Sequence, residues 1–415
     1  MTHYDIIIVG AGIAGLRFAL EAKKRNRNFK IIILEKYEKT GGRLYTQHST
    51  INGKKIHYES GAGRIHSSHK KTLELVKHYK LTTIPIDKEK LWRPYGSQES
   101  VPNNFEKFWT EMCEQFNELP LEVKRAKTLR DLAFETMDTG LAKNLLETYA
   151  YRAELEVASA ESGIDLYLSL KNGHYVIVAE GFSELINHMT KDTKEHGIEI
   201  KYNVSIEHIN IKKDKSYTAK SSDNKTYTCD RIVIAVHRNA LQTIYPFSIE
   251  HPLVKSVQME PLMRIYSVYK DASWFPEHPT ITNSPLRNII PINKSTGLIM
   301  SSYLDSRDLE LWTDLHKKDK RAELIEKVHN ETLALFSEKT IKEKPIMVDP
   351  QLWSDGCSYW LAGTDYKSLS NLALQPYAID YPKLHIIGES FSTKQQWIEG
   401  AVEHADSLIA LLYKK

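Results

Sequence analysis

Residues 4–35 have the sequence YDIIIVGAGIAGLRFALEAKKRNRNFKIIILE, and this stretch decides the fold. The apolar, β-branched run at 4–9 predicts a strand, and a glycine-rich turn follows it. Residues 13–25 carry apolar side chains at helical spacing, and 30–35 (KIIILE) form a second apolar run. Strand, helix and strand in this order make a βαβ unit, so the sequence predicts an α/β protein with a Rossmann-like domain.

The turn at 10–15 (GAGIAG) has the composition of a dinucleotide-binding turn. Its first two glycines permit a tight bend and close backbone approach to a pyrophosphate, and Gly15 lets helix and strand pack closely. Glu35 ends the second strand twenty residues after Gly15, where its carboxylate can accept hydrogen bonds from ribose hydroxyls. Strand, glycines, helix and terminal acid in one register predict a dinucleotide site, but they do not choose between NAD and FAD.

Outward from this unit, the pattern changes several times. Residues 67 to about 170 have apolar side chains at three- and four-residue intervals and are expected to be helical. Strands return in three segments, and a strand and a last helix occupy 384–412. The three strand segments are 174–178 (HYVIV), 198–210 and 226–236.

At 415 residues the chain is long for one simple core, so we expect two interleaved domains. The nucleotide-binding domain is expected to comprise 1–66, 172–240 and 353–415. A mixed α+β substrate domain with a helical insertion is expected to comprise 67–171 and 241–352.

Composition narrows the classes of partner. The chain has 41% hydrophobic and 26% charged residues, a formal net charge of +3, and no concentrated basic stripe. These values are typical of an ordinary globular protein and argue against nucleic acid as a partner. Cys113, Cys229 and Cys357 lie far apart without CxxC spacing, so we expect neither a disulfide framework nor a metal site.

The two ends of the sequence bear on its compartment. The first strand begins close to Met1, which leaves no room for a signal peptide, and the apolar run Leu408–Tyr413 is too short to span a bilayer. We therefore expect a cytoplasmic protein without a transmembrane segment.

The segment after Glu35 distinguishes between the cofactors. Gly41-Gly42-Arg43, followed by Tyr58-Glu59-Ser60-Gly61-Ala62-Gly63, resembles the flavin amine oxidase superfamily, which includes monoamine, polyamine and L-amino-acid oxidases. The resemblance implies a flavoprotein with two dinucleotide-binding domains and FAD as cofactor. Arg43 would lie along the diphosphate, to which its guanidinium offers a forked donor, and the later glycines would pass the flavin ring.

The resemblance continues along the chain. Gly181–Leu185 matches the family's turn before a helix, Val204 the residue that meets adenine, and Gly388-Glu389 with Trp397–Ala401 the second flavin-contact motif. In that family a helix begins at this motif and points its N-terminal amides at the flavin. The expected FAD-site residues are Gly10, Gly12, Ile13, Ala14, Gly15, Glu35, Lys36, Gly42, Arg43, Gly61, Ala62, Gly63, Arg64, Val204, Gly388, Glu389, Trp397, Ile398 and Ala401.

Three residues are the candidates for catalytic roles. Trp397 aligns with the aromatic wall that holds the substrate amine in amine oxidases; packing of the last helix is its alternative role. Arg64 follows Gly61-Ala62-Gly63 as the substrate-carboxylate arginine does in L-amino-acid oxidases, and a phosphate or a nearby carboxylate is its alternative partner. Arg264 aligns with the lysine that the family has near the flavin, and this replacement puts rapid reaction with dioxygen in doubt. The alternative is that Arg264 is an ordinary strand residue.

Two further sets of residues are weaker candidates. Cys357 falls where monoamine oxidases attach FAD, although Ser358 replaces the aromatic that normally follows, and noncovalent FAD is favoured. Tyr359 or Trp360 would then supply the missing aromatic face. His66 and His69 follow Arg64 and could act as bases. Histidines at a helix start are more often capping or surface groups, and that interpretation is preferred here.

The resemblance implies oxidation of the C–N bond of an amine or amino acid to an imine, with dioxygen as acceptor and hydrogen peroxide as product. One alternative is a flavoprotein of the same fold that acts on C–C bonds, such as a desaturase or protoporphyrinogen oxidase. The other is a non-catalytic flavin-binding protein.

Overall fold

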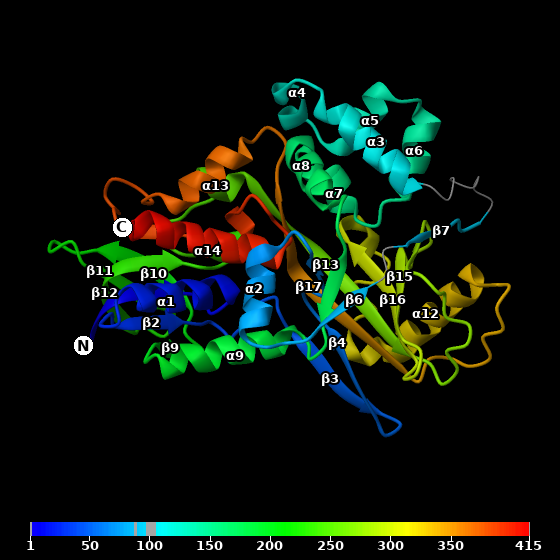
Figure 1. Cartoon of the computed structure of the whole chain (residues 1–415), viewed down its shortest axis with the longest axis horizontal. Helices are drawn as coiled ribbons and strands as arrows, with labels where there is room; N and C mark the ends of the chain where they lie inside the picture. The colour runs from blue at the N-terminus through cyan, green and yellow to red at the C-terminus, as the bar shows by residue number, and fades with distance from the viewer. Residues whose placement is uncertain (1, 87–88, 97–104, 415) are drawn as a thin grey trace.

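The structure is a computed structural model and describes residues 2–86, 89–96 and 105–414 (Figure 1). Two large β-sheets lie side by side, helices cover the first of them, and a group of short helices lies at the top of the view. The architecture mixes helices and sheets as expected, with an α/β layer next to a largely antiparallel one.

The first sheet has seven strands in the order β10-β11-β12-β1-β2-β9, and β18 also pairs with β12. Its centre is parallel, because β1 pairs in parallel with β2 and β12, β2 with β9, and β12 with β18. The bounds are β1 (His3–Val9), β2 (Ile31–Leu34), β9 (Glu199–Lys201), β10 (Ile206–Ile211), β11 (Tyr217–Ser221), β12 (Thr226–Ile234) and β18 (Leu384–Ile386).

Both faces of this sheet are buried, which explains why β1 and β2 are continuous apolar runs. Ile6 and Ile8 pack into one core with the helices, and Ile7 and Val9 pack into the core on the opposite face. The helices of the first core include α1 and α14, which lie against each other in Figure 1. The bounds are α1 (Ile13–Arg25), α2 (Lys70–His78), α9 (Phe182–Glu195) and α14 (Ile398–Leu412).

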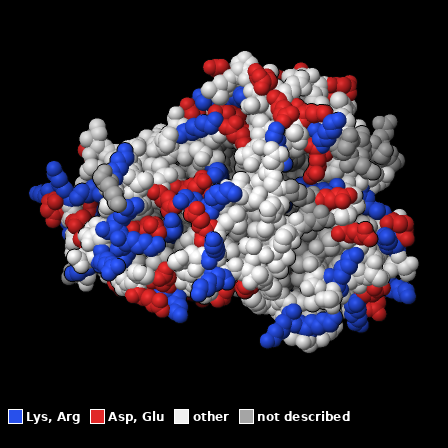
Figure 2. All heavy atoms as spheres, in the orientation of Figure 1, with Lys and Arg blue, Asp and Glu red and all other residues white. Residues whose placement is uncertain are grey.

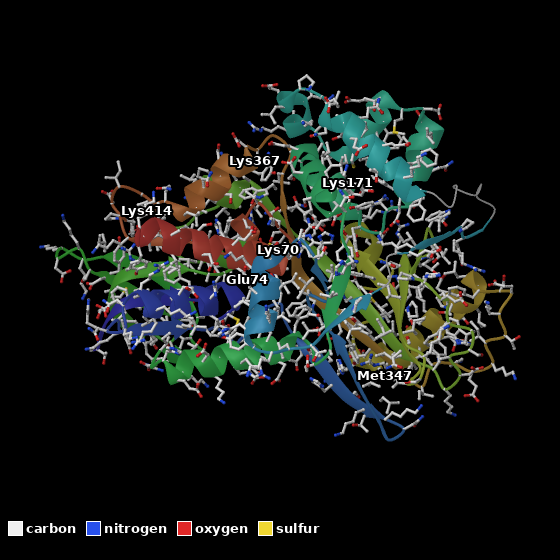
Figure 3. The ribbon with its side chains drawn as sticks, viewed as in Figure 1. Lys70, Glu74, Lys171, Met347, Lys367 and Lys414 are labelled. Carbon is white, nitrogen blue, oxygen red and sulfur yellow. The ribbon has the colours of Figure 1, made fainter. Side chains whose placement is uncertain are left out.

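The predicted βαβ unit is confirmed, with the helix at the predicted residues and the two strands shifted by about one residue at an end. The segment 67–170 is helical only in part. Its first helix, α2, carries Lys70 and Glu74, labelled in Figure 3, and contributes Leu75 and Val76 to the core of the first sheet.

Two short strands also lie in that segment, where a helical pattern was expected, so this part of the prediction is wrong. The strand β6 (Thr83–Ile86) pairs with β8 (Tyr175–Val178). The strand β7 (Leu91–Arg93) pairs with β14 (Thr280–Thr282). Their partners are far away along the chain, so local periodicity carries no signal for them.

The second sheet has six strands in the order β17-β13-β16-β15-β14-β7. Its longest strand, β17, begins at Met347, labelled in Figure 3, and continues to Trp360 across the expected domain boundary at 352–353. The division into two interleaved domains therefore stays a prediction. The other bounds are β13 (Val257–Val268), β15 (Asn288–Asn293), β16 (Leu298–Asp305) and the covering helix α12 (Arg321–Leu335).

A cap of short helices packs around its own core, which includes Trp109, Phe116 and Leu129. Side chains fix where several of these helices begin: Thr128 and Asp131 form a capping box, and Asp138 accepts from two amides of the next helix. The bounds are α3 (Phe105–Asn117), α4 (Leu121–Ala126), α5 (Leu129–Thr136), α6 (Thr139–Glu147), α7 (Arg152–Glu156) and α8 (Ala160–Leu170).

Smaller elements connect these layers. They are β3 (Thr46–Ile51) and β4 (Lys54–Glu59), which form a hairpin, β5 (Ile65–His66), which pairs with β8, α10 (Arg238–Leu241), α11 (Pro252–Lys255), α13 (Tyr366–Leu374), and the 3-10 segments η1 (Ser306–Leu309), η2 (Lys318–Lys320) and η3 (Glu389–Phe391). On the face seen in Figure 2, Lys and Arg side chains lie among Asp and Glu side chains. No helix within 2–86, 89–96 and 105–414 is long and apolar enough to cross a membrane.

Candidate active site

A cavity of about 420 Å³ lies where the carboxyl ends of the parallel strands in the first sheet meet the second sheet and the cap. Its walls include the β1–α1 turn, residues 61–64, strands β13, β16 and β17, and the start of α14. Every predicted site residue except Gly15 lines it, as do Arg264 and Cys357. Segments from distant parts of the chain therefore converge on one site, which is the central expectation from the sequence.

The β1–α1 turn needs glycine for two different reasons. Gly10 has a φ of +101°, and a Cβ there would lie 2.6 Å from the carbonyl oxygen of Ala235. Gly15 does not line the cavity; a Cβ there would lie 2.1 Å from the Gly10 carbonyl oxygen, so this glycine permits the close helix–strand packing that was predicted. A Cβ at Gly12 would meet nothing within 4 Å.

The beginning of α1 is suited to bind an anion. Gly12 caps the helix without a side-chain hydrogen bond, and its first turn has no acidic residue. The free N–H groups and the positive end of the helix dipole therefore act together toward a phosphate. Gly12, Ile13 and Ala14 all line the cavity at this point.

Glu35, Lys36 and Val204 line the cavity near the end of β2. The Glu35 carboxylate accepts hydrogen bonds from the amides of Ala11 at 2.6 Å and Tyr37 at 2.9 Å, and burial raises the pKa of Glu35. The backbone of Val204 is joined to that of Glu35 by a 2.8 Å hydrogen bond. An acid beside the glycine turn is the arrangement expected for a ribose, with Val204 adjacent for adenine.

Arg43 lies in the wall between these groups and α14. Its guanidinium donates to the carbonyl oxygen of Gly356 at 3.0 Å and forms an ion pair with Glu389. Gly61 packs against the backbone of Arg43 so closely that a Cβ would lie 1.8 Å from the Arg43 carbonyl oxygen. The uncapped helix, the Arg43 cation and the glycine walls together fit an elongated dinucleotide diphosphate such as that of FAD.

Arg64 faces the other end of the cavity. Its guanidinium carbon lies 4.6 Å from the ring centroid of Tyr175 and 5.6 Å from that of Trp397, and Nη2 donates to the hydroxyl of Tyr151 at 3.3 Å. None of the acidic side chains that the structure describes forms an ion pair with it. This guanidinium is therefore available to a carboxylate or a phosphate.

Arg264 is also in the cavity wall, but its guanidinium is held by the protein. It donates to the carbonyl oxygens of Glu59, at 3.1 Å, and Gly61, and to the hydroxyl of Tyr303 at 3.2 Å. The side chain lies 4.6 Å from the Tyr303 ring centroid. Arg264 thus fixes the 59–61 backbone beside the cavity, and few of its donors remain for a water molecule or a substrate.

Cys357 contributes a free thiol to the wall. Burial raises the pKa of this thiol to about 12. Of the two aromatics proposed to replace the residue lost at Ser358, Tyr359 lines the cavity, whereas Trp360 packs in the core and donates to the carbonyl of Ser392.

His66 and His69 are neither surface nor capping groups, so that interpretation is wrong. They are 1% and 2% exposed, and the His69 side chain makes no cap hydrogen bond at the start of α2. Both lie behind the aromatic wall, His69 against Trp397 and His66 against Tyr175, and burial lowers the pKa of His69 to about 3. This neutral histidine supports the wall.

Sequence reasoning missed several cavity residues, of which Tyr151, Glu154 and Tyr303 lie near the three catalytic candidates. The first two flank the start of α7 and the third is in β16, and none belongs to a recognisable motif. Asp305 fixes α7 by accepting hydrogen bonds from the amides of Arg152 at 2.8 Å and Ala153 at 2.9 Å.

An ionic network surrounds this attachment. Arg152 of the cap pairs with Asp308 at 3.1 Å, and Glu147 of the cap pairs with Arg287 at 3.1 Å. Burial raises the pKa of Asp305 to about 7. The network joins the cap to the second sheet and so determines where Tyr151 and Glu154 meet the cavity.

Comparison with known proteins identifies the class. The sequence model of the flavin containing amine oxidoreductases matches residues 13–407. The chain belongs to this family, and it is an FAD-dependent, amine oxidase-like oxidoreductase.

Solved structures of putrescine oxidase share the fold. A double mutant of that enzyme superposes with a TM-score of 0.76 and 14% identity over 99% of both chains. Wild-type putrescine oxidase bound to putrescine gives a TM-score of 0.76 and 13% identity, again over 99% of both chains. At this level of identity the likeness shows the fold alone.

Curated relatives match only a short part of the chain. A Bacillus subtilis (strain 168) protein, provisionally named L-amino-acid oxidase YobN, is 36% identical over 78 residues, which are 19% of this chain and 16% of that protein. L-2-hydroxyglutarate dehydrogenase of Indibacter alkaliphilus is 30% identical over 84 residues, 20% of this chain and 21% of the relative. The matches thus span less than a quarter of either relative.

Proposed function

We propose that the protein oxidises the C–N bond of an amino acid or related amine to an imine, which water then hydrolyses, with dioxygen as electron acceptor and hydrogen peroxide as second product. The observation that carries this proposal is one cavity in which the predicted FAD-binding segments adjoin Arg64, Trp397 and the three tyrosines Tyr151, Tyr303 and Tyr359. The name of the Bacillus relative supports an amino acid, and that of putrescine oxidase an amine.

The chain's own residues bind and orient the substrate. Bound FAD supplies the two-electron acceptor, which protein side chains cannot provide. Arg64 offers a forked donor to the substrate carboxylate, and Trp397 excludes water from the reacting carbon. Burial keeps the pKa values of Tyr151 and Tyr359 above the ordinary value for tyrosine, so both remain neutral hydrogen-bond donors at neutral pH.

The decisive experiment mixes the FAD-loaded protein anaerobically with amino acids and with simple amines or polyamines while flavin absorbance is followed. We expect an amino acid to bleach the flavin, and Arg64→Met to slow this by about a hundredfold at low substrate, as removal of one partner of a buried charged pair does. The exposed Arg130 is a matched control, since Arg130→Met leaves the cavity unchanged.

Equal bleaching of wild type and Arg64→Met by an amino acid would remove the carboxylate role of Arg64. If no amine or amino acid bleaches the flavin, the proposal of C–N oxidation itself is wrong. Hydrogen peroxide measured on admission of air tests the proposed acceptor.

Arg264 favours a second candidate, an FAD enzyme that oxidises C–C bonds. Its guanidinium is held by backbone carbonyls and Tyr303 where amine oxidases of the family have lysine. A desaturase or protoporphyrinogen oxidase-like activity would show flavin bleaching by a substrate that has no amine at the oxidised carbon.

The cytoplasmic location and the two interleaved domains are also proposals. Three free cysteines, two of them buried, support a reducing compartment. Cell fractionation and limited proteolysis would test the two proposals separately.

A further inference from the structure

The Arg64 guanidinium has an unusual setting for a substrate-binding group, because it lies over aromatic rings. The rings of Tyr175 and Trp397 are nearly parallel, with an interplanar angle of 14° and centroids 6.0 Å apart. The guanidinium carbon lies within 6 Å of both centroids, at 4.6 and 5.6 Å. Both distances are within the range of cation–π attraction.

These contacts restrict a side chain that is otherwise flexible. The two rings hold the guanidinium from their faces, and the hydroxyl of Tyr151 accepts from Nη2 at 3.3 Å. Trp397 lines the cavity, but Tyr175 does not and reaches Arg64 from β8. His66 packs edge-on against Tyr175 and His69 packs edge-on against Trp397. Two buried histidines therefore support the pair of rings.

The rings hold the guanidinium without neutralising it. Among residues 2–86, 89–96 and 105–414, no Asp or Glu is ion-paired with Arg64, whereas Arg43 in the same cavity is paired with Glu389. A half-buried guanidinium held in place with unused donors is pre-organised for an anion that enters from the cavity.

We propose that Tyr175 is a positioning residue which, with Trp397, holds Arg64 ready for the substrate carboxylate, so that these ring faces serve the guanidinium and not the substrate amine. The inference rests on the proposed function and makes it narrower. Amines that carry an α-carboxylate are the substrate class, and simple amines lack the group that the site is arranged to bind.

The test measures carboxylate binding as well as turnover. Benzoate is titrated by calorimetry into the FAD-loaded wild type, Tyr175→Leu, Tyr175→Phe and Ile177→Ala. Ile177 is a matched control, because it lies two residues along β8 on the same face and is also half-buried. We expect Tyr175→Leu to weaken benzoate binding about tenfold, and the other two variants to stay within about twofold of wild type.

A second measurement compares an amino acid with the amine formed by its decarboxylation. Tyr175→Leu should raise KM for the amino acid about tenfold without a similar rise for the amine, and Tyr175→Phe should restore the wild-type value because the ring remains. A purely structural role of Tyr175 would raise KM for the amino acid and for the amine to a similar extent.

Unchanged benzoate affinity in Tyr175→Leu, no benzoate binding by wild type, or an equal loss in Ile177→Ala would each overturn the inference. A selective loss of benzoate affinity without any turnover of amines or amino acids would support the positioning role while it removes the proposed function.

Discussion

The two ends of the cavity are built from different parts of the chain. The nucleotide end is formed largely by backbone, where Gly10 and Gly61 leave no room for a side chain and Gly12 opens toward the cavity. The substrate end is formed by side chains, such as Arg64, Tyr303 and Tyr359, from elements that are far apart in the sequence. One end is therefore determined by local chain geometry, and the other by how the two sheets and the cap pack together.

This difference separates cofactor binding, which depends on the fold, from substrate choice. A turn of fixed backbone shape can bind only a ligand with a matching shape, and here we expect that ligand to be a diphosphate at the N-terminus of α1. Side chains supplied by several elements can be exchanged without change to the sheet, so they are where substrate preference is set. Substitutions at the nucleotide end should therefore impair packing or FAD binding, whereas substitutions at the substrate end should impair the reaction with substrate.

The largest effect is expected at Gly15. A Cβ there would lie 2.1 Å from the Gly10 carbonyl, so Gly15→Ala must push α1 away from β1 and should lower the free energy of unfolding by about 4 kcal/mol. Denaturant unfolding of the FAD-free protein measures this change.

Gly12→Ala is the matched control for Gly15→Ala. Its Cβ would meet nothing within 4 Å, and its φ of −70° suits alanine, so stability should change little. The added methyl would project toward the cavity and weaken FAD binding, which flavin absorbance detects. Equal unfolding free energies for both variants would contradict the separation of packing from binding.

The attachment of α7 to the second sheet should give the next effect, through pH. Burial raises the pKa of Asp305 from 3.8 to about 7, so the folded protein favours the protonated carboxyl. Its contribution to stability is therefore fully present below about pH 4 and is lost as pH rises through 7, by on the order of 4 kcal/mol at about 1.4 kcal/mol per pKa unit.

Asp305→Asn removes the titrating group, so the pH dependence of unfolding between about pH 4 and 8 should become flatter than in wild type. Asp319, which is exposed, provides a control in Asp319→Asn. The same pH profile for Asp305→Asn and wild type would show that another group is responsible. The charged groups that act on Asp305 are Glu154 and Asp308, and the negative charge of each raises the pKa of Asp305.

The nucleotide end could be predicted from the sequence because its determinants are local. The local register of the βαβ unit predicts α1 at 13–25 and brings Gly10 and Glu35 into one site, whereas Val204 is predicted only by the resemblance to the family. Gly15 was assigned to the cofactor site as well as to packing, and only its packing role has a direct geometric basis in the structure.

The substrate end could be predicted only where a motif reached it. Arg64 and Trp397 adjoin glycine-rich segments and were found, whereas Tyr151, Tyr175 and Tyr303 come from a loop before a five-residue helix and from two strands. Tyrosines are common in strands and cap helices, so no periodicity marks those that face a cavity. Their pairing with Arg64 depends on tertiary packing alone.

A smaller effect is expected at Arg264. The guanidinium is tied to the carbonyls of Glu59 and Gly61 and to Tyr303, and a lysine could keep only part of these contacts. Arg264→Lys should therefore leave a cation with free donors and increase the rate at which the reduced enzyme consumes dioxygen by about tenfold, on the order of 1.4 kcal/mol.

Stopped-flow mixing of the anaerobically reduced enzyme with oxygenated buffer measures that rate. Tyr303→Phe serves as a comparison, since it removes one partner of Arg264 and keeps the charge. A rate in Arg264→Lys at or below that of wild type would show that the arginine does not limit the reaction with dioxygen.

The smallest effect is expected at Cys357, the one predicted site residue for which two modes of FAD binding were considered. Covalent attachment requires a thiolate, and burial raises the pKa of this thiol to about 12, so the nucleophilic form is scarce at neutral pH. Acid precipitation should release the flavin from wild type and from Cys357→Ser alike, with unchanged absorbance in the supernatant. A pellet that stays yellow in wild type but not in the variant would show a covalent link, and would mean that a side chain, and not only the backbone, fixes the cofactor at the boundary between the two ends.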